Sequence, residues 1–351
     1  MHFTPSIIFF YELFFETCII AVKAYPAIIY LAQISSENSN TELLTSLSAL
    51  YSVFTFKHPE YPIIVAYDSM ESRYLNPSLK KKIITAVDGS ECNCNDDTKY
   101  NYLALEQVKA QTRVCFAAIK KFRHVPWPFQ LYQDDYKEKN PYYSRLGYRN
   151  MCRFWAITIF KQPFMKNISI YFRLDTDTYL YDMPQNPFEI IRSKNIVYLS
   201  SAIYKEGLQQ TEGLWETFLR FAVKENLHPA GLFALSNPSD NNEYTKKDLY
   251  KLSVKEAAIV LLDRGYNLDY IYNNWEVSRT EIWRSKIYEK LALFIEESGG
   301  IFMRRWGDAP IRTMALHLLQ DYYNDKGNFS FPYFQQYKGL RYFHKAIHFI
   351  P

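Results

Sequence analysis

The chain has 351 residues, of which 48% are hydrophobic and 22% are charged. This composition is ordinary for a globular protein and excludes a chain that is disordered throughout. The formal net charge of +4 is too balanced for nucleic acid to be the main partner. None of the 11 glycines lies in a G-x-G-x-x-G or a G-x-x-x-x-G-K-[ST] motif, so the two commonest phosphate-binding loops are absent.

The N-terminal segment is the one stretch whose hydrophobicity suggests a membrane. Residues 6–22 are mostly apolar, but Glu12 and Glu16 interrupt them, and a bilayer span requires about 20 apolar residues and tolerates carboxylates poorly. The segment ends in a pattern close to a signal-peptidase site. We therefore expect residues 1–24 to be a signal peptide or a signal-anchor, with an amphipathic helix of the domain as the alternative, and residues 25–351 to form a single domain.

The first predicted elements form a βαβ unit. Residues 26–35 and 61–68 are short β-branched runs typical of strands, and residues 41–56 carry leucines at helical spacing after Asn40 or Thr41 as the N-cap. A strand–helix–strand order predicts a parallel sheet with helices on its faces.

The elements that follow alternate between loops, helices and a third strand. We expect loops over residues 88–99 and 125–147, helices over residues 103–122 and 148–160, and a strand over residues 168–174. The fold class is therefore α/β.

The C-terminal third is predicted to be largely helical. Residues 281–296 and 308–320 have helical spacing, the glycine pair 299–300 ends the first of these helices, and residues 301–303 are interpreted as a short strand.

The five cysteines have no zinc-ligand spacing. A disulfide from Cys92 or Cys94 to Cys115 is one interpretation, and buried thiols are the alternative.

Two carboxylates follow the third predicted strand directly. Asp175 and Asp177 lie at its carboxyl end, which is where ligands bind in open parallel sheets. Carboxylates two residues apart in a turn can both reach one Mg²⁺ or Mn²⁺ ion, which keeps open positions for phosphate oxygens. The alternative is a turn with two solvated aspartates.

Three further segments carry chemically useful groups. Asp308 precedes a helix within GGIFMRRWGDAP, Glu276 follows aromatic and amide residues, and Tyr148, Arg149 and Arg153 can donate to phosphate. The corresponding structural interpretations are a helix cap, a surface glutamate and an amphipathic helix with exposed arginines.

These segments, in this order, resemble the fungal-type α-1,2-mannosyltransferases of glycosyltransferase family 15. That family has a YR-x-MCR helix, a Y-W-R-V-E-P strand, an SNFEI stretch and a G-G-F-x-x-x-RWGDAP motif, and this sequence has YRNMCR, YFRLDTD, NNWEV and GGIFMRRWGDAP. Residues 206–215 also look like the family's E…T-x-x-LW segment. The resemblance covers residues 125–344 and, more weakly, the first βαβ unit.

The resemblance implies a GT-A type fold, a mixed and mostly parallel sheet flanked by helices, which binds a nucleotide sugar. It implies GDP-mannose as the donor, Mn²⁺ as the cofactor and a mannosylated glycoprotein or oligosaccharide as the acceptor. It also implies a place in the secretory pathway, in the Golgi lumen or as a type II Golgi membrane protein. A UDP-sugar transferase and a non-catalytic sugar-binding relative are the alternatives.

The resemblance also assigns roles to residues. Asp175 falls on a metal-binding glutamate of the family, and His344 falls near its metal-binding histidine, with His348 as a competitor. Tyr148 falls on the tyrosine that contacts the donor phosphate, and we add Arg149, Arg153 and Asp177 as donor-binding residues. Glu276 falls on the family's nucleophile candidate and Asp308 on its active-site aspartate.

Two positions depart from the family pattern. Thr176 replaces the proline of E-P, and residues 269–272 read DYIY where the family has a cysteine. Cys152 therefore lacks its family-type disulfide partner. Because the α-linked donor gives an α-linked product, the predicted reaction retains configuration, through either a carboxylate nucleophile or same-face attack within an ion pair.

Overall fold

The predicted βαβ unit opens the domain. The computed structural model describes residues 24–94, 111–126, 129, 146–238, 244–324, 334–345 and 347–350. Strands β1 (Tyr25–Ala32) and β2 (Ile63–Asp68) pair in parallel, and α1 (Glu37–Leu50) connects them. The helix begins earlier than predicted, because Ser36 is the N-cap and its side chain accepts a hydrogen bond from the backbone N–H of Ser39.

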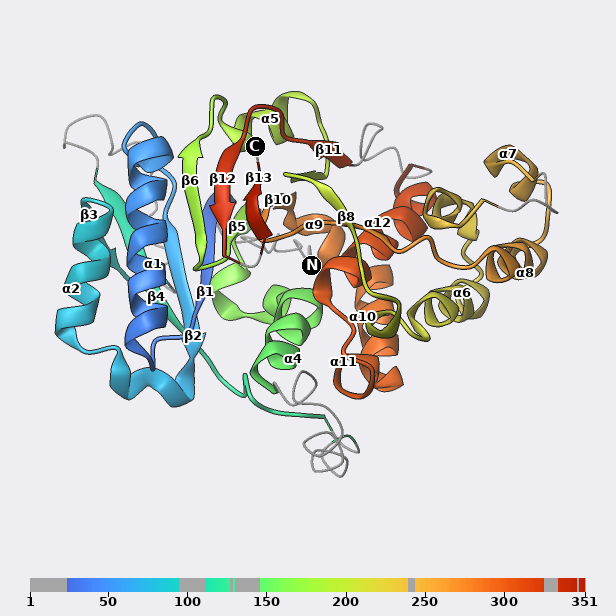
Figure 1. Cartoon of the computed structure of the whole chain (residues 1–351), viewed down its shortest axis with the longest axis horizontal. Helices are drawn as coiled ribbons and strands as arrows, with labels where there is room; N and C mark the ends of the chain where they lie inside the picture. Colours follow the sequence, from blue (N-terminus) through green and yellow to red (C-terminus); the bar gives the residue numbers. More distant parts are fainter. Residues whose placement is uncertain are drawn as a thin grey trace, which may run out of the picture.

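The central sheet has eight strands in the order β11-β7-β10-β5-β1-β2-β4-β3 (Figure 1). The remaining strands are β3 (Gly89–Cys92), β4 (Thr112–Ile119), β5 (Ile168–Leu174), β7 (Tyr198–Ser200), β10 (Trp275–Arg279) and β11 (Phe334–Gln336). Strand β10 runs antiparallel to both of its neighbours, and every other pair is parallel. The carboxyl ends of β1, β2, β4 and β5 therefore lie at one edge of the sheet, and the predicted mixed, mostly parallel sheet is confirmed.

Two small sheets extend beyond this edge. One contains β6 (Thr178–Asp182), β12 (Arg341–His344) and β13 (Ile347–Ile350), and the other contains β8 (Ile203–Lys205) and β9 (Asp269–Ile271). The other helices are α2 (Pro77–Ala86), α4 (Leu146–Arg153), α5 (Pro187–Ser193), α6 (Leu214–Lys224), α7 (Lys246–Leu249), α8 (Val254–Arg264), α9 (Thr280–Trp283), α10 (Lys286–Ser298), α11 (Gly300–Met303) and α12 (Asp308–Asn324).

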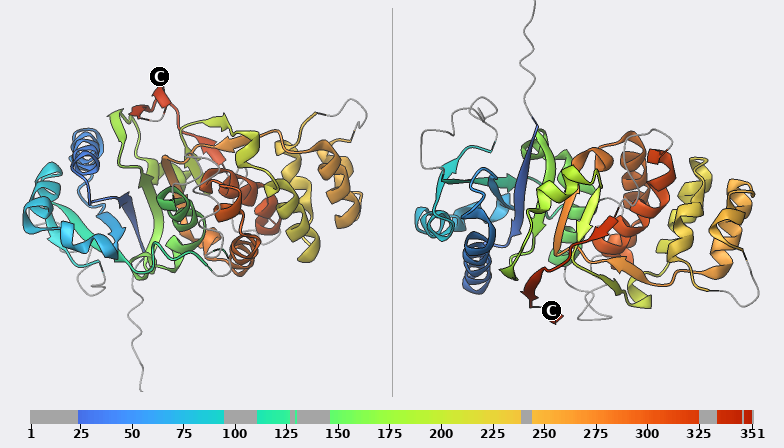
Figure 2. Two further views of the ribbon diagram at one scale, coloured as in Figure 1. Left: turned by 60° about the horizontal axis from the view of Figure 1, so that its bottom comes forward. Right: turned by 90° about the horizontal axis from the view of Figure 1, so that it is seen from above.

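The sheet separates two hydrophobic cores. Alternate residues of β1 enter opposite cores, with Ile28 and Tyr30 facing α1, and Ala27 and Ile29 facing the layer of α4, α10 and α12. Figure 2 shows the resulting order along the long axis, with the blue helices at one end, the sheet in the middle and the yellow and orange helices at the other. Both faces of the central sheet are therefore buried.

Several predicted elements are wrong. The helix expected over residues 103–122 is strand β4 where the chain is described, because its apolar residues are buried on both faces between β2 and β3. Part of the loop expected over residues 88–99 is strand β3. The strand expected over residues 301–303 is helix α11, because Gly299 adopts a φ of 70° that ends α10 and restarts a helical turn.

Outside these errors, the predicted helix over residues 148–160 and the third strand are confirmed. In the described parts of the chain no helix combines the length and the apolar character needed to cross a bilayer. Residues 6–22 lie outside those parts, so the signal or anchor assignment and the domain boundary at residue 24 stay predictions.

A disulfide joins Cys94 to Cys115 across 21 residues of chain, which confirms one of the two predicted pairings. Cys152 is a buried thiol without a disulfide partner. The bond closes the connection between β3 and β4 at the edge of the sheet.

Reduction of the disulfide should lower the free energy of unfolding by about 3 kcal/mol, because it releases a loop of about 20 residues in the unfolded chain. Urea unfolding followed by tryptophan fluorescence, with and without dithiothreitol, measures the change. A Cys94→Ser/Cys115→Ser double variant is the control and should not respond to dithiothreitol. Peptide mapping that finds both cysteines as thiols in the oxidised protein would contradict the prediction.

Candidate active site at the carboxyl edge of the sheet

The two predicted aspartates lie where β5 leaves the sheet. The backbone N–H of Asp175 donates to the carbonyl of Asn274 at 3.0 Å, and the N–H of Thr178 donates to the carbonyl of Asp175 at 3.0 Å. This tight turn leads directly into β6. It therefore holds Asp175 and Asp177 at the carboxyl edge of the sheet, as the sequence predicts.

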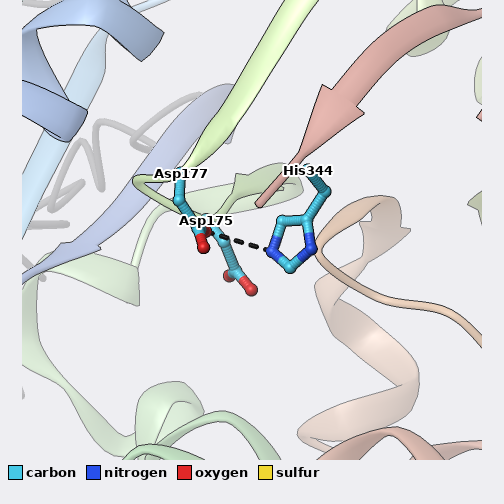
Figure 3. A group of neighbouring side chains, drawn as sticks. All are labelled: Asp175, Asp177 and His344. Atoms are coloured by element: carbon cyan, nitrogen blue, oxygen red, sulfur yellow. Dashed lines mark ion pairs between the residues drawn. The ribbon is translucent and has the colours of Figure 1, made fainter. Parts of the chain in front are cut away.

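A distant segment brings a histidine to the same turn. Strand β12 pairs antiparallel with β6 so that His344 lies opposite Thr178. Its Nε2 is 3.0 Å from Oδ1 of Asp177, and ligand atoms of Asp175, Asp177 and His344 all lie within 4.8 Å of one another (Figure 3). The competitor His348 lies on β13, but its side chain is outside the described part of the structure.

These three side chains fit a divalent cation of the Mn²⁺ type. Two carboxylate oxygens and an imidazole nitrogen are ligands that Mn²⁺ accepts. The Tyr272 hydroxyl lies 2.8 Å from Nδ1 of His344 and orients the ring with Nε2 toward the aspartates, which is the usual supporting contact of a metal-binding histidine. Sequence reasoning missed Tyr272, because nothing in the sequence places it beside a histidine 72 residues away.

The ionisation of the aspartates favours the same interpretation. Burial raises the pKa of Asp175, and the negative charge of Asp177 adds to this rise. The positive charges of Arg173 and His344 lower the same pKa but do not cancel the effect of burial. Burial also acts on Asp177, but its hydrogen bond and ion pair with His344 bring its pKa below the ordinary value. A bound cation would stabilise the charged form of Asp175, which burial disfavours.

Arg173 joins this cluster to the RWGDAP segment. Its side chain is 2% exposed and contacts Oδ1 of Asp175 at 2.9 Å and Oδ2 of Asp308 at 2.6 Å. The guanidinium also lies 4.2 Å from the ring centre of Trp155. Sequence reasoning missed Arg173, although an arginine inside an otherwise apolar strand was an available signal.

Asp308 begins α12 and is buried. Besides Arg173, it accepts a hydrogen bond of 2.8 Å from Nδ2 of Asn273. The Cys152 thiol is hydrogen-bonded to both Tyr148 and Asp308, and the neighbouring Cys152, burial and the charge of Asp308 raise the pKa of Tyr148, which keeps its proton. The structure thus places Asp175, Asp308 and Tyr148 around one region.

Glu276 lies one layer deeper in the protein. It is 0% exposed, and its Oε1 lies 2.8 Å from both the Tyr171 hydroxyl and Nη1 of Arg312. Its Oε2 accepts a hydrogen bond from the Tyr198 hydroxyl. Every oxygen of this carboxylate therefore faces a protein group, and its assignment as the nucleophile stays a prediction.

The two arginines of YRNMCR hold helices together in this structure. Arg149 is buried and donates to the carbonyl of Phe302 on α11, and Arg153 pairs with Glu296 on α10. Their predicted contacts with the donor phosphate stay predictions.

A cavity of about 490 Å³ lies at the same edge of the sheet. Its lining includes the end of β1, Asp68 at the end of β2, and Tyr148 on α4. Glu71 and Arg123 also line it, and Arg123 pairs with both Asp68 and Glu71. Because β1 lies between β2 and β5, this cavity and the Asp175 turn are neighbours. Its volume is within the range of ordinary ligand sites.

Sequence comparisons identify relatives of this chain. A family model described as "Glycolipid 2-alpha-mannosyltransferase" matches residues 129–335. "Probable mannosyltransferase KTR2" of Saccharomyces cerevisiae is 30% identical over 185 residues, which is 52% of this chain and 42% of KTR2. "Alpha-1,2 mannosyltransferase KTR1" of the same yeast is 24% identical over 344 residues, with 82% of each chain covered. The match thus spans less than half the length of KTR2.

Solved structures show the same fold. The mannosyltransferase Ktr4p from S. cerevisiae in complex with GDP has a TM-score of 0.66 at 21% identity, covering 94% of this chain and 73% of that chain. Core-mannan synthase A from Aspergillus fumigatus, in a Mn/GDP form, has a TM-score of 0.65 at 19% identity, covering 92% and 75%. These matches confirm the predicted GT-A type α/β fold.

The family match extends over more than half of the chain. It includes the YRNMCR helix, the Asp175 turn and the RWGDAP segment, which the fold brings to one sheet edge. The chain therefore belongs to the fungal-type α-1,2-mannosyltransferases of glycosyltransferase family 15.

Proposed function

We propose that this protein is a retaining α-1,2-mannosyltransferase that moves mannose from GDP-mannose to a mannosylated glycan of a glycoprotein or oligosaccharide. The observation that carries the proposal is the cluster of Asp175, Asp177 and His344 beside the cavity at the carboxyl edge of the sheet. The names of KTR1 and of the GDP-bound structures support it.

Different residues of the site bind different parts of the donor. The cavity takes the nucleoside, and the protonated hydroxyl of Tyr148 donates to a phosphate oxygen. Asp175, Asp177 and His344 would hold the Mn²⁺ ion. When bound, Mn²⁺ neutralises the negative charge of the departing diphosphate. Asp308, already oriented by Arg173 and Asn273, accepts a hydrogen bond from a sugar hydroxyl.

The transfer forms one bond and breaks another. A bond forms between the acceptor's 2-hydroxyl oxygen and the anomeric carbon, the bond from that carbon to the diphosphate breaks, and the hydroxyl proton passes to the diphosphate. A Glu276 nucleophile requires that the contacts with Arg312, Tyr171 and Tyr198 open. Same-face attack leaves these buried contacts in place.

The disulfide between Cys94 and Cys115 supports a location in the secretory pathway, because disulfides persist in oxidising compartments. We propose the Golgi, as its lumenal protein or as a type II membrane protein held by residues 1–24.

Loss of a metal ligand should weaken Mn²⁺ binding by at least ~10-fold. The variants are Asp177→Asn and His344→Ala, and isothermal titration of Mn²⁺ in the presence of GDP measures the affinity. Asp182→Asn is the matched control, because it removes an exposed carboxylate at the opposite end of β6. Equal Mn²⁺ affinity in all four proteins would exclude this cluster as the metal site.

The purified protein with Mn²⁺, GDP-mannose and methyl α-mannoside should release GDP and form a disaccharide. Asp308→Asn should lower kcat by ~100-fold or more, the scale of losing a key polar contact to the transition state. A donor panel with UDP-sugars tests the main rival, since faster turnover of a UDP-sugar would replace this proposal. Binding of GDP-mannose without turnover would support a non-catalytic relative instead.

A catalytic role of Glu276 can be separated experimentally from its structural ion pair with Arg312. Glu276→Gln leaves the Arg312 charge buried without a partner and should cost about 3–5 kcal/mol of stability. The double variant Glu276→Gln/Arg312→Met removes both charges and should recover most of that loss in urea unfolding. If Glu276 is the nucleophile, the stable double variant stays inactive. Recovered transfer activity would exclude Glu276 as the nucleophile and favour same-face attack.

A further inference from the structure

Three cysteines lie together at the end of the central sheet, where β3 is the outermost strand. Cys94 and Cys115 form the disulfide, with their Cα atoms 5.3 Å apart, and Cys92 is a thiol. Strand β3 pairs in parallel with β4 so that Cys92 lies directly opposite Cys115. Figure 1 shows β3 at one end of the molecule, beside α2 and β4. Cys115 therefore has two cysteines beside it, and the disulfide uses one of them.

The three side chains share one face of the sheet. Cys115 is buried in the hydrophobic core that includes residues of α4, α10 and α12, and Cys92 and Cys94 both pack against this same core. Glu91, which precedes Cys92, faces the other way, because it pairs with Lys80 of α2 at 2.6 Å. Alternation along β3 thus turns Cys92 toward the face that carries Cys115.

The register of β3 and β4 suits a second disulfide. Facing residues of neighbouring strands lie about 4.8 Å apart, and a disulfide requires a Cα–Cα distance of about 4.4–6.8 Å with both side chains on one face. Cys92 and Cys115 meet both conditions through strand pairing alone. Cys115 can therefore bond to Cys92 without a change in the sheet.

The burial of Cys115 determines which thiol can attack it. Thiol–disulfide exchange requires access of a thiolate to the sulfur that it attacks. Cys115 is 1% exposed, so a thiol in solution has almost no access to its sulfur, whereas Cys92 already lies on the neighbouring strand. A neighbouring group in this position acts at a far higher effective concentration than a thiol in solution. Cys92 is also partly exposed, so its proton can pass to water.

We infer that Cys92, Cys94 and Cys115 form a thiol–disulfide exchange site. Cys92 loses its proton to water and its sulfur attacks Sγ of Cys115. The bond between Cys92 and Cys115 forms as the bond between Cys94 and Cys115 breaks, and the Cys94 thiolate takes a proton from water. No electron is gained or lost overall, so the step requires no oxidant or reductant. The inference does not depend on the proposed transferase activity.

The exchange moves the thiol and keeps the cross-link. The new bond lengthens the closed loop by only two residues, and the entropy of loop closure changes with the logarithm of loop length, so the two forms differ little in this respect. Strand β4, which leads to Phe122 and Arg123 of the cavity, stays linked to the β3 segment in both forms. The thiol passes from Cys92 within β3 to Cys94 beyond its end.

Cysteine labelling of the purified, oxidised protein tests the exchange. After incubation at about pH 8, acid quenching stops exchange because it removes the thiolate. The protein is then unfolded and alkylated with N-ethylmaleimide at mildly acidic pH, and tandem mass spectrometry locates the label. In the wild type, Cys94 should carry label as well as Cys92. In Cys92→Ser, the label on Cys94 should fall by ~10-fold or more, because the attacking thiol is absent.

Cys152 is the internal reference for this labelling. It is a buried thiol and should be labelled to the same extent in both unfolded proteins. An equal label on Cys94 in the wild type and in Cys92→Ser overturns the inference. Label on Cys115 in the wild type also overturns it, because that result places the attack on the sulfur of Cys94.

A second variant tests whether the alternative bond can form. Cys94→Ser removes the present disulfide, and in a buffer of reduced and oxidised glutathione it should form the bond between Cys92 and Cys115. A non-reducing peptide map identifies the linked peptides, and the urea midpoint of this variant should fall when dithiothreitol is added. Cys92→Ser/Cys94→Ser is the matched control and should not respond. Cys92 and Cys115 recovered as thiols from folded Cys94→Ser would reject the exchange site.

Discussion

A buried arginine organises the site of this protein. Arg173 lies inside β5, between β1 and β10, where its guanidinium has almost no access to solvent. A charge in such a place is tolerated only when it is paired and hydrogen-bonded. The partners are Asp175, two residues on in the same chain segment, and Asp308, at the start of α12. The need to neutralise one arginine therefore holds together two segments that are far apart in the sequence.

The sheet topology then arranges the rest around this pair. Because β1, β2, β4 and β5 are parallel, the cavity and the Asp175 turn share one edge. Because β10 is antiparallel, the segment that precedes it, with Tyr270 and Tyr272, projects past the same edge. The order of the cavity, the Asp175 turn and the β8–β9 ribbon follows from the order of the strands in the sheet together with their directions.

A second buried pair lies beneath the first. Arg312 and Glu276 contact each other at 2.8 Å, and the guanidinium lies 4.2 Å from the ring centre of Trp283. Burial alone would lower the pKa of Arg312, but the charge of Glu276 and the neighbouring hydroxyls of Tyr171, Tyr198 and Tyr288 together raise it. Both pairs lie between β5, β10 and α12, so the layer under the reaction site is charged, paired and rigid. Such a layer fixes the positions of the side chains above it more closely than an apolar layer of equal volume would, because each hydrogen bond requires a particular geometry.

Motif reading named Asp175, Asp177, His344, Tyr148 and Asp308, and the fold brings Asp175, Asp177 and His344 together at one edge of the sheet, while the roles of all five residues stay predictions. It failed where a residue acts through a partner distant in the sequence. Arg173, Tyr272 and the cavity residues Asp68 and Arg123 carry no motif, and their roles depend on which strands become neighbours. The helix expected over residues 103–122 was wrong for the same reason, because a run that is apolar on both faces, as in β4, suits either a buried helix or a buried strand.

By itself, the sequence determined most of the local elements, the family and the residue types available for chemistry, because these depend largely on short-range spacing and on motifs read along the chain. Only the tertiary structure decided that His344 meets Asp177, that Cys94 is the partner of Cys115, and that Glu276 lies buried against Arg312. Strand order and register set these contacts, and both depend on the burial of whole faces rather than on any short segment.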